Sequence, residues 1–331
     1  MASIKDVAEL AGVSKATVSR VLNNTGQIRE GTRARVHKAM EKLNYRPSPL
    51  AKSLATSSSN TVGLVVTSYR GHFYSELMAE VQEEMEVQGK FLLVSRGKRS
   101  RSSEQEAIQR LTDMCCDGLI LHTRNMFDED LVDLSKGSTP FVVLDRSVKD
   151  LEDRSIVYDH TLAGKMAVEH LLEKGHRKIA CIAGPRSRMT AALRFDGYVQ
   201  ALESYGISVD ESLVAEADYD RLGGYRAMKD ILERQPDITA VYSCSEEMTV
   251  GAFDLFRERG INLPGDISII SFDSVSLCTM LTPQVSTVHF PIKEMAAESA
   301  RVLTALMHGE QDVQPQRFIP ELRLRDSVRE I

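Results

Sequence analysis

The fold of the amino-terminal part is decided by the stretch Val13-Ser14-Lys15-Ala16-Thr17-Val18-Ser19-Arg20-Val21-Leu22. Ser14 has the side-chain oxygen of a helix N-cap, and apolar residues recur after it at helical spacing, which predicts a short helix with one buried stripe. That stripe comprises Val18, Val21 and Leu22. The outward-facing residues are small, polar or basic, as in a helix that enters the major groove of DNA. They are Lys15, Ala16, Thr17, Ser19 and Arg20.

A second short helix is predicted immediately before this one. Ser3 is an N-cap candidate, and Asp6 three residues later completes a start that is similar to a capping box. The apolar face comprises Val7, Ala8 and Ala11, and Gly12 supplies the turn that ends the helix. Two helices joined at a glycine are common, and basic residues on a helix usually face solvent, so this geometry alone does not assign DNA binding.

A third helix, expected over residues 29–43, would complete a small core with the first two. Its apolar face comprises Val36, Ala39, Met40 and Leu43. Thr32, Arg33 and Arg35 are candidates for contacts with DNA phosphates. The helix ends before Pro47, because the residue before a proline disfavours the α conformation. Ser48 and Pro49 then open a further short helical pattern, which is too short to be stable alone and is equally typical of a tether.

Charge is divided unequally along the chain. The protein has 331 residues and a formal net charge of −6. Residues 1–58 contain ten Lys and Arg against four Asp and Glu, a net charge of +6, which leaves −12 on the other 273 residues. A basic head on an acidic body fits a head that contacts phosphate groups. A further basic cluster over residues 96–101 is typical of a solvated loop, with a second nucleic-acid patch as the alternative.

Several classes of protein are disfavoured by composition. No apolar run approaches the ~18 residues of a membrane span and no apolar segment follows the amino terminus, so we expect a cytoplasmic protein with no membrane partner. The five cysteines suit reduced thiols, and we expect the adjacent Cys115 and Cys116 to pack in a core because they lack zinc-site spacing. No phosphate-cradling, metal-ligand or nucleophile motif is present, so we predict no metal, no cofactor and no enzymatic activity.

From Thr61 onward, short apolar runs alternate with helical patterns, which predicts buried parallel strands connected by helices. The first series has expected strands over 62–67, 91–95, 118–122, 141–145 and 156–158 and helices over 75–88, 103–114 and 129–134. The second has strands over 179–183, 213–215, 240–243 and 267–272 and helices over 163–174, 189–205, 222–233 and 246–259. Two such series predict an α/β body of two doubly wound subdomains.

Ligands of open α/β sheets bind beyond the carboxyl ends of the strands, so the residues that follow the expected strands form the candidate ligand site. We select Phe73, Tyr74, Asp145, Arg188, Thr190, Arg194, Tyr219, Ser245 and Asp273. Aromatic faces suit the C–H surfaces of sugar rings, and carboxylates and arginines suit hydroxyl groups, so the set predicts a carbohydrate-type cleft. Each of these residues alone is equally well explained by core packing or by a surface charge.

The amino-terminal stretch resembles the helix-turn-helix of the lactose/galactose repressor family of bacterial transcriptional regulators. The resemblance rests on Lys5-Asp6-Val7-Ala8, Ala11-Gly12-Val13-Ser14 and Thr17-Val18-Ser19-Arg20-Val21-Leu22-Asn23. It implies a DNA-binding head over 1–47, a hinge helix and linker over 48–60, and a periplasmic-binding-protein-like body over 61–331. Lobe 1 of that body would take residues 61–159 and 289–317, and lobe 2 residues 160–288 and 318–331.

The resemblance also implies partners and residue roles. The protein would bind pseudo-palindromic operator DNA as a homodimer, with hinge helices that fold on DNA and insert a leucine, here Leu54, into the minor groove. DNA contacts are then expected from Lys5, Ser14, Lys15, Ala16, Thr17, Ser19, Arg20, Asn23, Thr32, Arg33 and Leu54. In the body, Arg194 matches the family's ligand-clamping arginine, Asp273 the first acid of an aromatic-Asp-Asp motif and Tyr219 the aromatic residue on the opposite wall.

Two departures from the family pattern affect the expected ligand. Ser245 and Glu246 stand where the family usually has Asn-Asp, and Ser274 stands where it has a second Asp. The serine side chain is shorter than that of asparagine, and it cannot donate and accept hydrogen bonds to one ligand in a bidentate contact as the asparagine amide does. Together with Arg186 and Arg188, expected at the cleft mouth, these changes leave open an acidic sugar or a sugar phosphate as well as a neutral sugar. In the family, ligands either release the regulator from DNA or promote its binding, and the resemblance to the galactose and β-glucoside repressors favours release by a sugar.

Two other functions compete with a regulator. A plain sugar-binding or transport protein would explain the cleft but not the basic head. An α/β enzyme would use Asp145 or Asp273 as acid or base, but no nucleophile or cofactor motif accompanies them.

Overall fold

A computed structural model of the chain describes residues 2–22, 25–45, 58–98, 100–273, 277–310 and 312–331, without the side chain of Asp273. The chain forms two compact units, residues 1–60 and 61–331, and each is treated by itself. Two predicted DNA contacts, Asn23 and Leu54, lie outside the described residues, as does most of the expected hinge.

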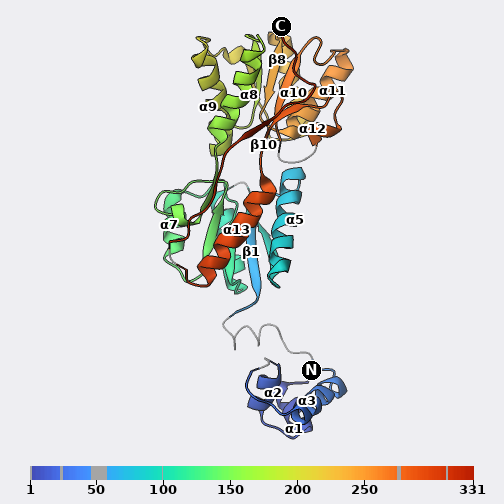
Figure 1. The fold of residues 1–331 in the computed structure, drawn as a ribbon, viewed down its shortest axis with the longest axis vertical. Coiled ribbons are helices and arrows are strands. Elements are labelled where there is room, and N and C mark those ends of the chain that lie inside the picture. The colour runs from blue at the N-terminus through green and yellow to red at the C-terminus, as the bar shows by residue number, and fades with distance from the viewer. Residues whose placement is uncertain (1, 23–24, 46–57, 99, 274–276, 311) are drawn as a thin grey trace. The chain divides into compact units, whose positions relative to one another are not determined.

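The first unit contains α1 (Ile4–Ala11), α2 (Lys15–Leu22) and α3 (Glu30–Lys42) (Figure 1). The predicted capping box of α1 is confirmed: the Asp6 amide donates to Ser3 Oγ (3.4 Å) and the Ser3 amide donates to the Asp6 carboxylate (2.8 Å). Gly12 ends α1 with a left-handed φ of +61°. The buried apolar residues come from all three helices, as predicted, and are Val7, Ala8, Ala11, Val18, Val21, Val36 and Ala39.

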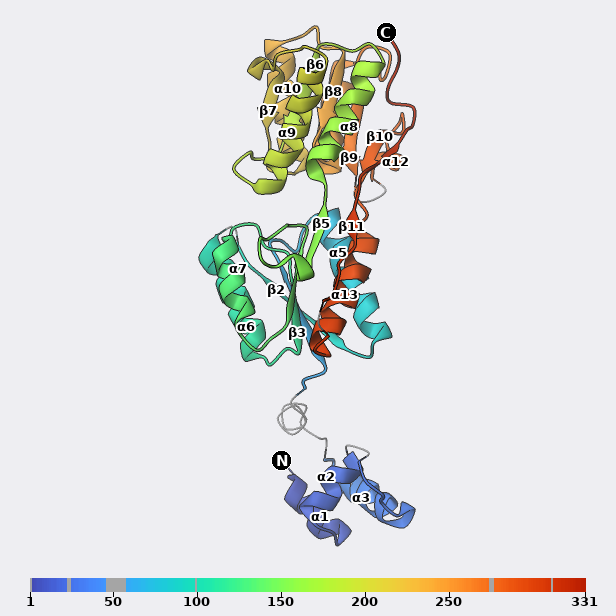
Figure 2. The same ribbon diagram turned by 60° about the vertical axis from the view of Figure 1, so that its left-hand side comes forward.

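Lobe 1 of the second unit is built on a six-stranded parallel sheet in the order β11-β5-β4-β3-β1-β2. Its strands are β1 (Thr61–Val66), β2 (Phe91–Arg96), β3 (Gly118–Leu121), β4 (Phe141–Leu144), β5 (Ser155–Tyr158) and β11 (Arg317–Phe318). Helices α5 (His72–Val87) and α13 (Ile292–Met307) cover one face, and α6 (Arg101–Asp113) and α7 (Asp128–Ser135) cover the other (Figure 2). Strand residues alternate between these layers, so Leu64 packs with α5 while Val65 packs with α6.

Lobe 2 repeats this plan in the order β12-β10-β9-β8-β6-β7. Its strands are β6 (Ile179–Ala183), β7 (Val214–Glu216), β8 (Ala240–Ser243), β9 (Ser268–Asp273), β10 (Ser286–His289) and the antiparallel β12 (Glu321–Arg323). Helices α8 (His160–Glu173) and α9 (Met189–Ser204) cover one face, and α10 (Arg221–Arg234) and α11 (Glu246–Arg259) the other, with the short α12 (Leu277–Met280) beside them (Figure 1). The predicted fold class, a helix-turn-helix head with two doubly wound subdomains, is confirmed.

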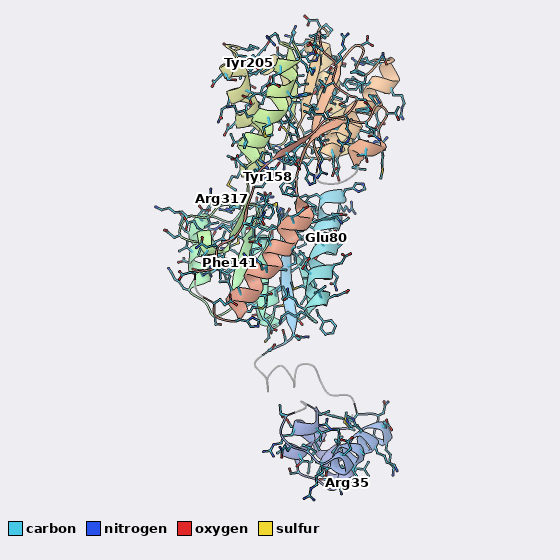
Figure 3. All side chains as sticks on the ribbon, in the orientation of Figure 1. Arg35, Glu80, Phe141, Tyr158, Tyr205 and Arg317 are labelled. Carbon is cyan, nitrogen blue, oxygen red and sulfur yellow. The ribbon has the colours of Figure 1, made fainter. Side chains whose placement is uncertain are left out.

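The chain passes between the lobes from β5 to α8, from β10 to α13 and from β11 to β12. The three crossings are hydrogen-bonded to one another. Tyr158 Oη donates to the His289 carbonyl oxygen (2.8 Å), and the Asp159 amide donates to the Phe318 carbonyl oxygen (3.3 Å). Figure 3 shows Tyr158, with Arg317 on the neighbouring strand, at the level where the two lobes meet.

The structure departs from the sequence prediction at one cysteine. Cys115 was expected in the core with Cys116, but it is exposed, whereas Cys116 is buried. Cys115 follows the end of α6 with a left-handed φ of +56°, which turns the chain and leaves its side chain outside the packed layer. The expectation for Cys115 is therefore wrong.

Glycines set the spacing of two helix pairs in lobe 2. A Cβ atom on Gly197 of α9 would lie 2.3 Å from the Thr161 carbonyl oxygen of α8. In the second pair, a Cβ on Gly224 of α10 would lie 2.1 Å from the Met248 carbonyl oxygen of α11. Backbones this close leave no room for a methyl group, so α9 and α11, which begin at the ligand side of the sheet, are held by direct backbone contact.

We expect Gly224→Ala to lower the free energy of unfolding of the body by about 1–3 kcal/mol, because overpacking separates α10 from α11. Asp230→Ala, on the exposed face of the same helix, is the matched control and should change stability by less than about 0.5 kcal/mol. Urea unfolding followed by circular dichroism measures both. Equal stability of the two variants would contradict the tight helix contact.

Candidate functional site

A cavity of about 500 Å³ lies between the two lobes, at the carboxyl ends of both sheets. Eight of the nine residues selected from the sequence line it: Phe73, Tyr74, Asp145, Arg188, Thr190, Arg194, Tyr219 and Ser245. The ninth, Asp273, ends β9, and its side chain lies outside the described part of the chain. The volume is in the range of natural small-molecule sites.

The apolar floor of the cavity is aromatic and draws on both lobes. Phe290, at the second crossing, lies 5.7 Å from Phe73 and 5.9 Å from Phe272 between ring centroids. The Arg194 guanidinium stacks on the Phe272 ring, 3.5 Å from its centroid. Arg194 is therefore held flat against the floor, and its Nη1 donates to the Cys244 carbonyl oxygen (2.7 Å).

Asp145 is a buried carboxylate in the lobe 1 wall. Arg124 Nη2 donates to its Oδ2 (2.5 Å), Arg124 Nη1 donates to its carbonyl oxygen (3.0 Å), and His160 Nε2 lies 2.7 Å from its Oδ1. Burial opposes ionisation of Asp145, but His160 and Arg124 outweigh it and hold the pKa well below its usual range. Asp145 is therefore charged at neutral pH and has its oxygens fixed in direction.

Glu104 is a second buried carboxylate, and it holds the loop that carries Arg124. Its Oε1 accepts from the Arg124 amide (3.0 Å) and from Asn125 Nδ2 (2.7 Å). Its Oε2 accepts from the amides of Asn125 (2.9 Å) and Met126 (3.0 Å). Glu104 is fully buried, and the Gly97 backbone packs against it. A carboxylate that receives four N–H groups fixes the loop, and with it Arg124 and Asn125 on the cavity wall.

The mouth of the cavity has paired charges. Arg188 Nη2 donates to the Asp218 carboxylate (3.3 Å). Arg186 was expected at the mouth, but this is wrong: it is not among the described lining residues and instead pairs with Glu216 (2.8 Å) and Glu211 (3.1 Å). The loop after β6 makes a turn, in which the Arg188 amide donates to the Pro185 carbonyl oxygen (2.9 Å), and of these two arginines Arg188 lines the cavity.

A contact between the lobes closes one side of the mouth. The Glu247 carboxylate, from the first turn of α11, accepts from the His72 amide (2.9 Å) at the start of α5. The residue before that helix, Gly71, has no side chain that could cap it. Glu247 therefore supplies a helix cap from the opposite lobe, where the helix dipole favours negative charge.

Tyr219 and Ser245 occupy constrained positions on the lobe 2 wall. Tyr219 has a left-handed φ of +59°, and its ring lies so close to Gly184 that a Cβ there would be 2.2 Å from it. Burial raises the pKa of Tyr219 to about 12, which keeps its hydroxyl protonated. Ser245 caps α11 by accepting from the Met248 amide (3.3 Å), which leaves its hydroxyl hydrogen for other partners.

Sequence analysis did not select several residues of the cavity wall, among them His122, Arg124, Asn125, Phe272 and Phe290. His122 and Arg124 follow β3 directly, so the rule that selected Asp145 after β4 also applies to them. The expected strand over 118–122 was one residue too long and included His122. Phe290 follows β10, which was not predicted as a strand.

The predicted DNA-contact residues that the structure describes in the head are exposed or half-buried. Lys5, Ser14, Lys15, Ala16 and Arg20 are exposed. Thr17, Ser19, Thr32 and Arg33 are half-buried. The Thr17 amide donates to Ser14 Oγ (3.1 Å), which caps α2 and places Lys15 and Ala16 in its first turn. The amino-terminal turn of a second helix is the part that reads bases in helix-turn-helix proteins.

Both parts of the chain match known families. Residues 3–48 match the bacterial regulatory proteins of the lacI family, and residues 168–328 match the periplasmic binding protein-like domain. Over 306 residues, 92% of this chain and 89% of the relative, the chain is 37% identical to the HTH-type transcriptional regulator GalR of Escherichia coli (strain K12). The chain belongs to the lacI family.

Two solved structures have a similar fold. The lac repressor dimer bound to operator and the anti-inducer ONPF has a TM-score of 0.88 at 28% identity, covering 99% of each chain. The complex of the transcriptional regulator CelR with cellobiose has a TM-score of 0.72 at 29% identity, covering 99% of this chain and all of the other. Membership of the lacI family confirms the prediction of a regulator without enzymatic activity.

Two further observations concern this lacI-family chain. In the described ranges, no three His, Cys, Asp or Glu side chains are grouped so that they could hold a metal ion. The described helices also include none that is both long and apolar enough to cross a membrane.

We expect Glu104→Gln to lower the free energy of unfolding by about 1–3 kcal/mol, because the amide NH₂ would face backbone N–H donors inside the protein. Glu106→Gln on the same helix is the control, since Glu106 forms an exposed ion pair with Arg110 (3.8 Å), worth less than about 1 kcal/mol. Thermal and urea unfolding of the full chain compare the two. A Glu104→Gln protein as stable as the control would show that the carboxylate does not hold the loop.

Proposed function

We propose that this lacI-family regulator binds pseudo-palindromic operator DNA as a homodimer and that a neutral sugar bound between its lobes releases it. The observation that carries the proposal is a two-lobed polar cavity in a chain whose basic head is a helix-turn-helix. We assign the head to residues 1–47, the hinge and linker to 48–60 and the ligand-binding body to 61–331. A homodimer matches the two half-sites of a pseudo-palindrome by its own two-fold axis.

Charge balance at the cavity favours a neutral sugar over an acidic sugar or a sugar phosphate. Among the described residues, the charged ones that line the cavity are four cations and five anions: Arg70, Arg124, Arg188, Arg194, Asp145, Asp218, Asp220, Glu246 and Glu247. Arg124 and Arg188 already face carboxylates, and Arg186 points elsewhere. An added phosphate would enter a site without surplus positive charge, which is unfavourable in a partly buried cavity.

The polar atoms of the wall suit hydroxyl groups. Tyr219 Oη and His122 Nδ1 are buried and have no hydrogen-bond partner among the described residues. Buried polar atoms are rarely left in this state, and sugar hydroxyls both donate and accept. Asp145 and Arg194 offer a charged acceptor and a charged donor from opposite lobes. Phe73, Phe272 and Phe290 supply apolar faces for a sugar ring, so the site has the residue types that carbohydrate binding requires.

In the head, we assign base contacts to Lys15 and Ala16 in the first turn of α2, and base and phosphate contacts to Thr17, Ser19 and Arg20. Lys5, Ser14, Asn23, Thr32 and Arg33 would add contacts that position the head on the DNA backbone. The hinge role of Leu54 stays a prediction from the family pattern. Similarity to the lac repressor dimer bound to operator supports these assignments.

Selection from random duplexes tests DNA binding. The full chain is expected to retain a pseudo-palindrome, with binding that weakens as salt rises because phosphate contacts release counterions. Arg20→Ala is expected to weaken binding to that duplex by about tenfold or more. Lys229→Ala, an exposed substitution on α10 of the body, is the charge-matched control and is expected to bind normally. If the retained duplexes share no sequence, the head binds DNA only through general electrostatic attraction, which would contradict the proposed operator binding.

Isothermal titration calorimetry tests the ligand class, with D-galactose, D-glucose and cellobiose against glucuronate and glucose 6-phosphate. We expect a neutral sugar to bind and to lower operator affinity, and the charged sugars to bind more weakly. Arg194→Lys is expected to weaken sugar binding by about tenfold, because lysine cannot stack and donate as the guanidinium does. Arg186→Lys is the control, since Arg186 also stacks on an aromatic ring, Phe195 (4.8 Å), but outside the cavity. Tighter binding of a charged sugar would overturn the neutral-ligand proposal.

A further inference from the structure

His160 lies behind the cavity wall, at the first crossing between the lobes. It is the first residue of α8, it is 2% exposed, and it is not among the described residues that line the cavity. Its ring is nearly parallel to Phe272 (25°) and to Phe290 (17°), with centroids 5.8 and 5.9 Å away. Tyr158 packs against its edge at 5.0 Å. The surrounding rings hold the imidazole in one plane.

The two ring nitrogens of His160 contact different lobes. Nε2 lies 2.7 Å from Asp145 Oδ1 in lobe 1, and Nδ1 lies 3.2 Å from Arg194 Nε in lobe 2. A carboxylate only accepts and a guanidinium only donates, so Nε2 must carry the proton and Nδ1 must be the acceptor. Burial lowers the pKa of His160 and favours the neutral ring that this arrangement requires.

The contacts form one continuous path from lobe 1 to lobe 2. Arg124 holds Asp145 (2.5 Å), Asp145 accepts from His160, and His160 accepts from Arg194. Arg124, Asp145 and Arg194 all line the cavity, whereas His160 joins them from behind. Since His160 moves with α8 and Asp145 moves with β4, a change in the angle between the lobes must alter the contact between them.

We propose that His160 is a positioning residue that makes the orientation of Arg194 in lobe 2 depend on the position of Asp145 in lobe 1. This inference rests on the proposed function, in which a sugar binds to both walls. The Asp145 carboxylate accepts hydrogen bonds and the Arg194 guanidinium donates them. A ligand hydroxyl group that contacts both residues then meets an acceptor and a donor whose directions are set together. Binding on one wall therefore favours the lobe angle at which the other wall also binds.

Nuclear magnetic resonance of the ligand-free protein tests the geometry without any sugar. With ¹⁵N-labelled histidine, the His160 ring is expected to show the nitrogen shifts of a neutral imidazole protonated at Nε2. Arg194→Lys is expected to move the Nδ1 shift, and Asp145→Asn to move the Nε2 shift. A charged ring, or a ring protonated at Nδ1, would overturn the inference even if the protein binds sugar as proposed.

Two substitutions separate the two contacts in binding experiments. His160→Gln places an amide nitrogen near the position of Nε2 and keeps a donor to Asp145, while His160→Asn places an amide oxygen near the position of Nδ1 and keeps an acceptor for Arg194. The probe is whichever of D-galactose, D-glucose and cellobiose binds the unmodified protein most tightly. We expect each variant to weaken the binding of that sugar by about tenfold, because the loss of either His160 contact uncouples the two walls.

His176→Gln is the matched control. His176 is a fully buried histidine of lobe 2 with partners on both nitrogens, Thr239 Oγ1 (2.9 Å) and the Arg329 carbonyl oxygen (3.1 Å), and it lies outside the cavity lining. We expect it to lower the melting temperature as the His160 variants do but to leave sugar affinity within about twofold. Normal sugar affinity in either folded His160 variant would overturn the coupling. So would a loss of sugar affinity in His176→Gln as large as that in the His160 variants. Absence of any sugar binding by the unmodified protein would instead contradict the proposed function.

Discussion

The direction of the chain at the lobe crossings determines where a ligand can bind. One strand of each sheet leads the chain into the other lobe: β5 of lobe 1 continues into α8, and β10 of lobe 2 continues into α13. Since the neighbouring strands are parallel to these two, the carboxyl ends of both sheets face each other. Loops at those ends carry the ligand sites of open α/β sheets, so two such lobes must share one cavity. The same direction explains the closing strands: β11 runs with β5, and its continuation β12 runs against β10.

Charged groups at this interface are paired with other groups of the protein. Within the cavity wall, Arg124 pairs with Asp145 and Arg188 pairs with Asp218. The Glu247 carboxylate accepts a hydrogen bond from the His72 amide. In a partly buried site such pairing lowers the cost of keeping charges away from water. It also leaves hydroxyl-binding atoms in fixed directions, which reduces the ordering that a ligand must impose. A polar, uncharged ligand can use these atoms without displacing a pair, and this is the physical basis for the neutral-sugar proposal.

The parts that could be predicted are those in which a local pattern repeats. The strand over Ile179–Ala183 and the helix over Glu246–Arg259 have their expected bounds, because continuous apolar runs and helical spacing are strong signals. The two-residue β11 has no such pattern and exists only through pairing with β5. Eight cavity residues were predicted from the rule that ligands bind beyond strand ends. The rule could not distinguish Arg186 from Arg188, because both lie in the same loop and only the folded structure shows which side chain reaches the cavity. His160 carried no signal, since its role depends on residues 15 and 34 positions away.

Asp145 shows why one residue type meets several demands at this site. Its φ of +59° lies in the left-handed region, where residues other than glycine are uncommon and aspartate and asparagine are the most tolerated. Glycine would relieve the backbone but would remove the carboxylate that Arg124 and His160 contact. Asparagine would keep the backbone but would leave the half-buried Arg124 without its counter-charge. Aspartate alone satisfies backbone, charge and hydrogen-bond direction at this position. The strained turn after β4 and the polar path between the lobes therefore both depend on this one side chain.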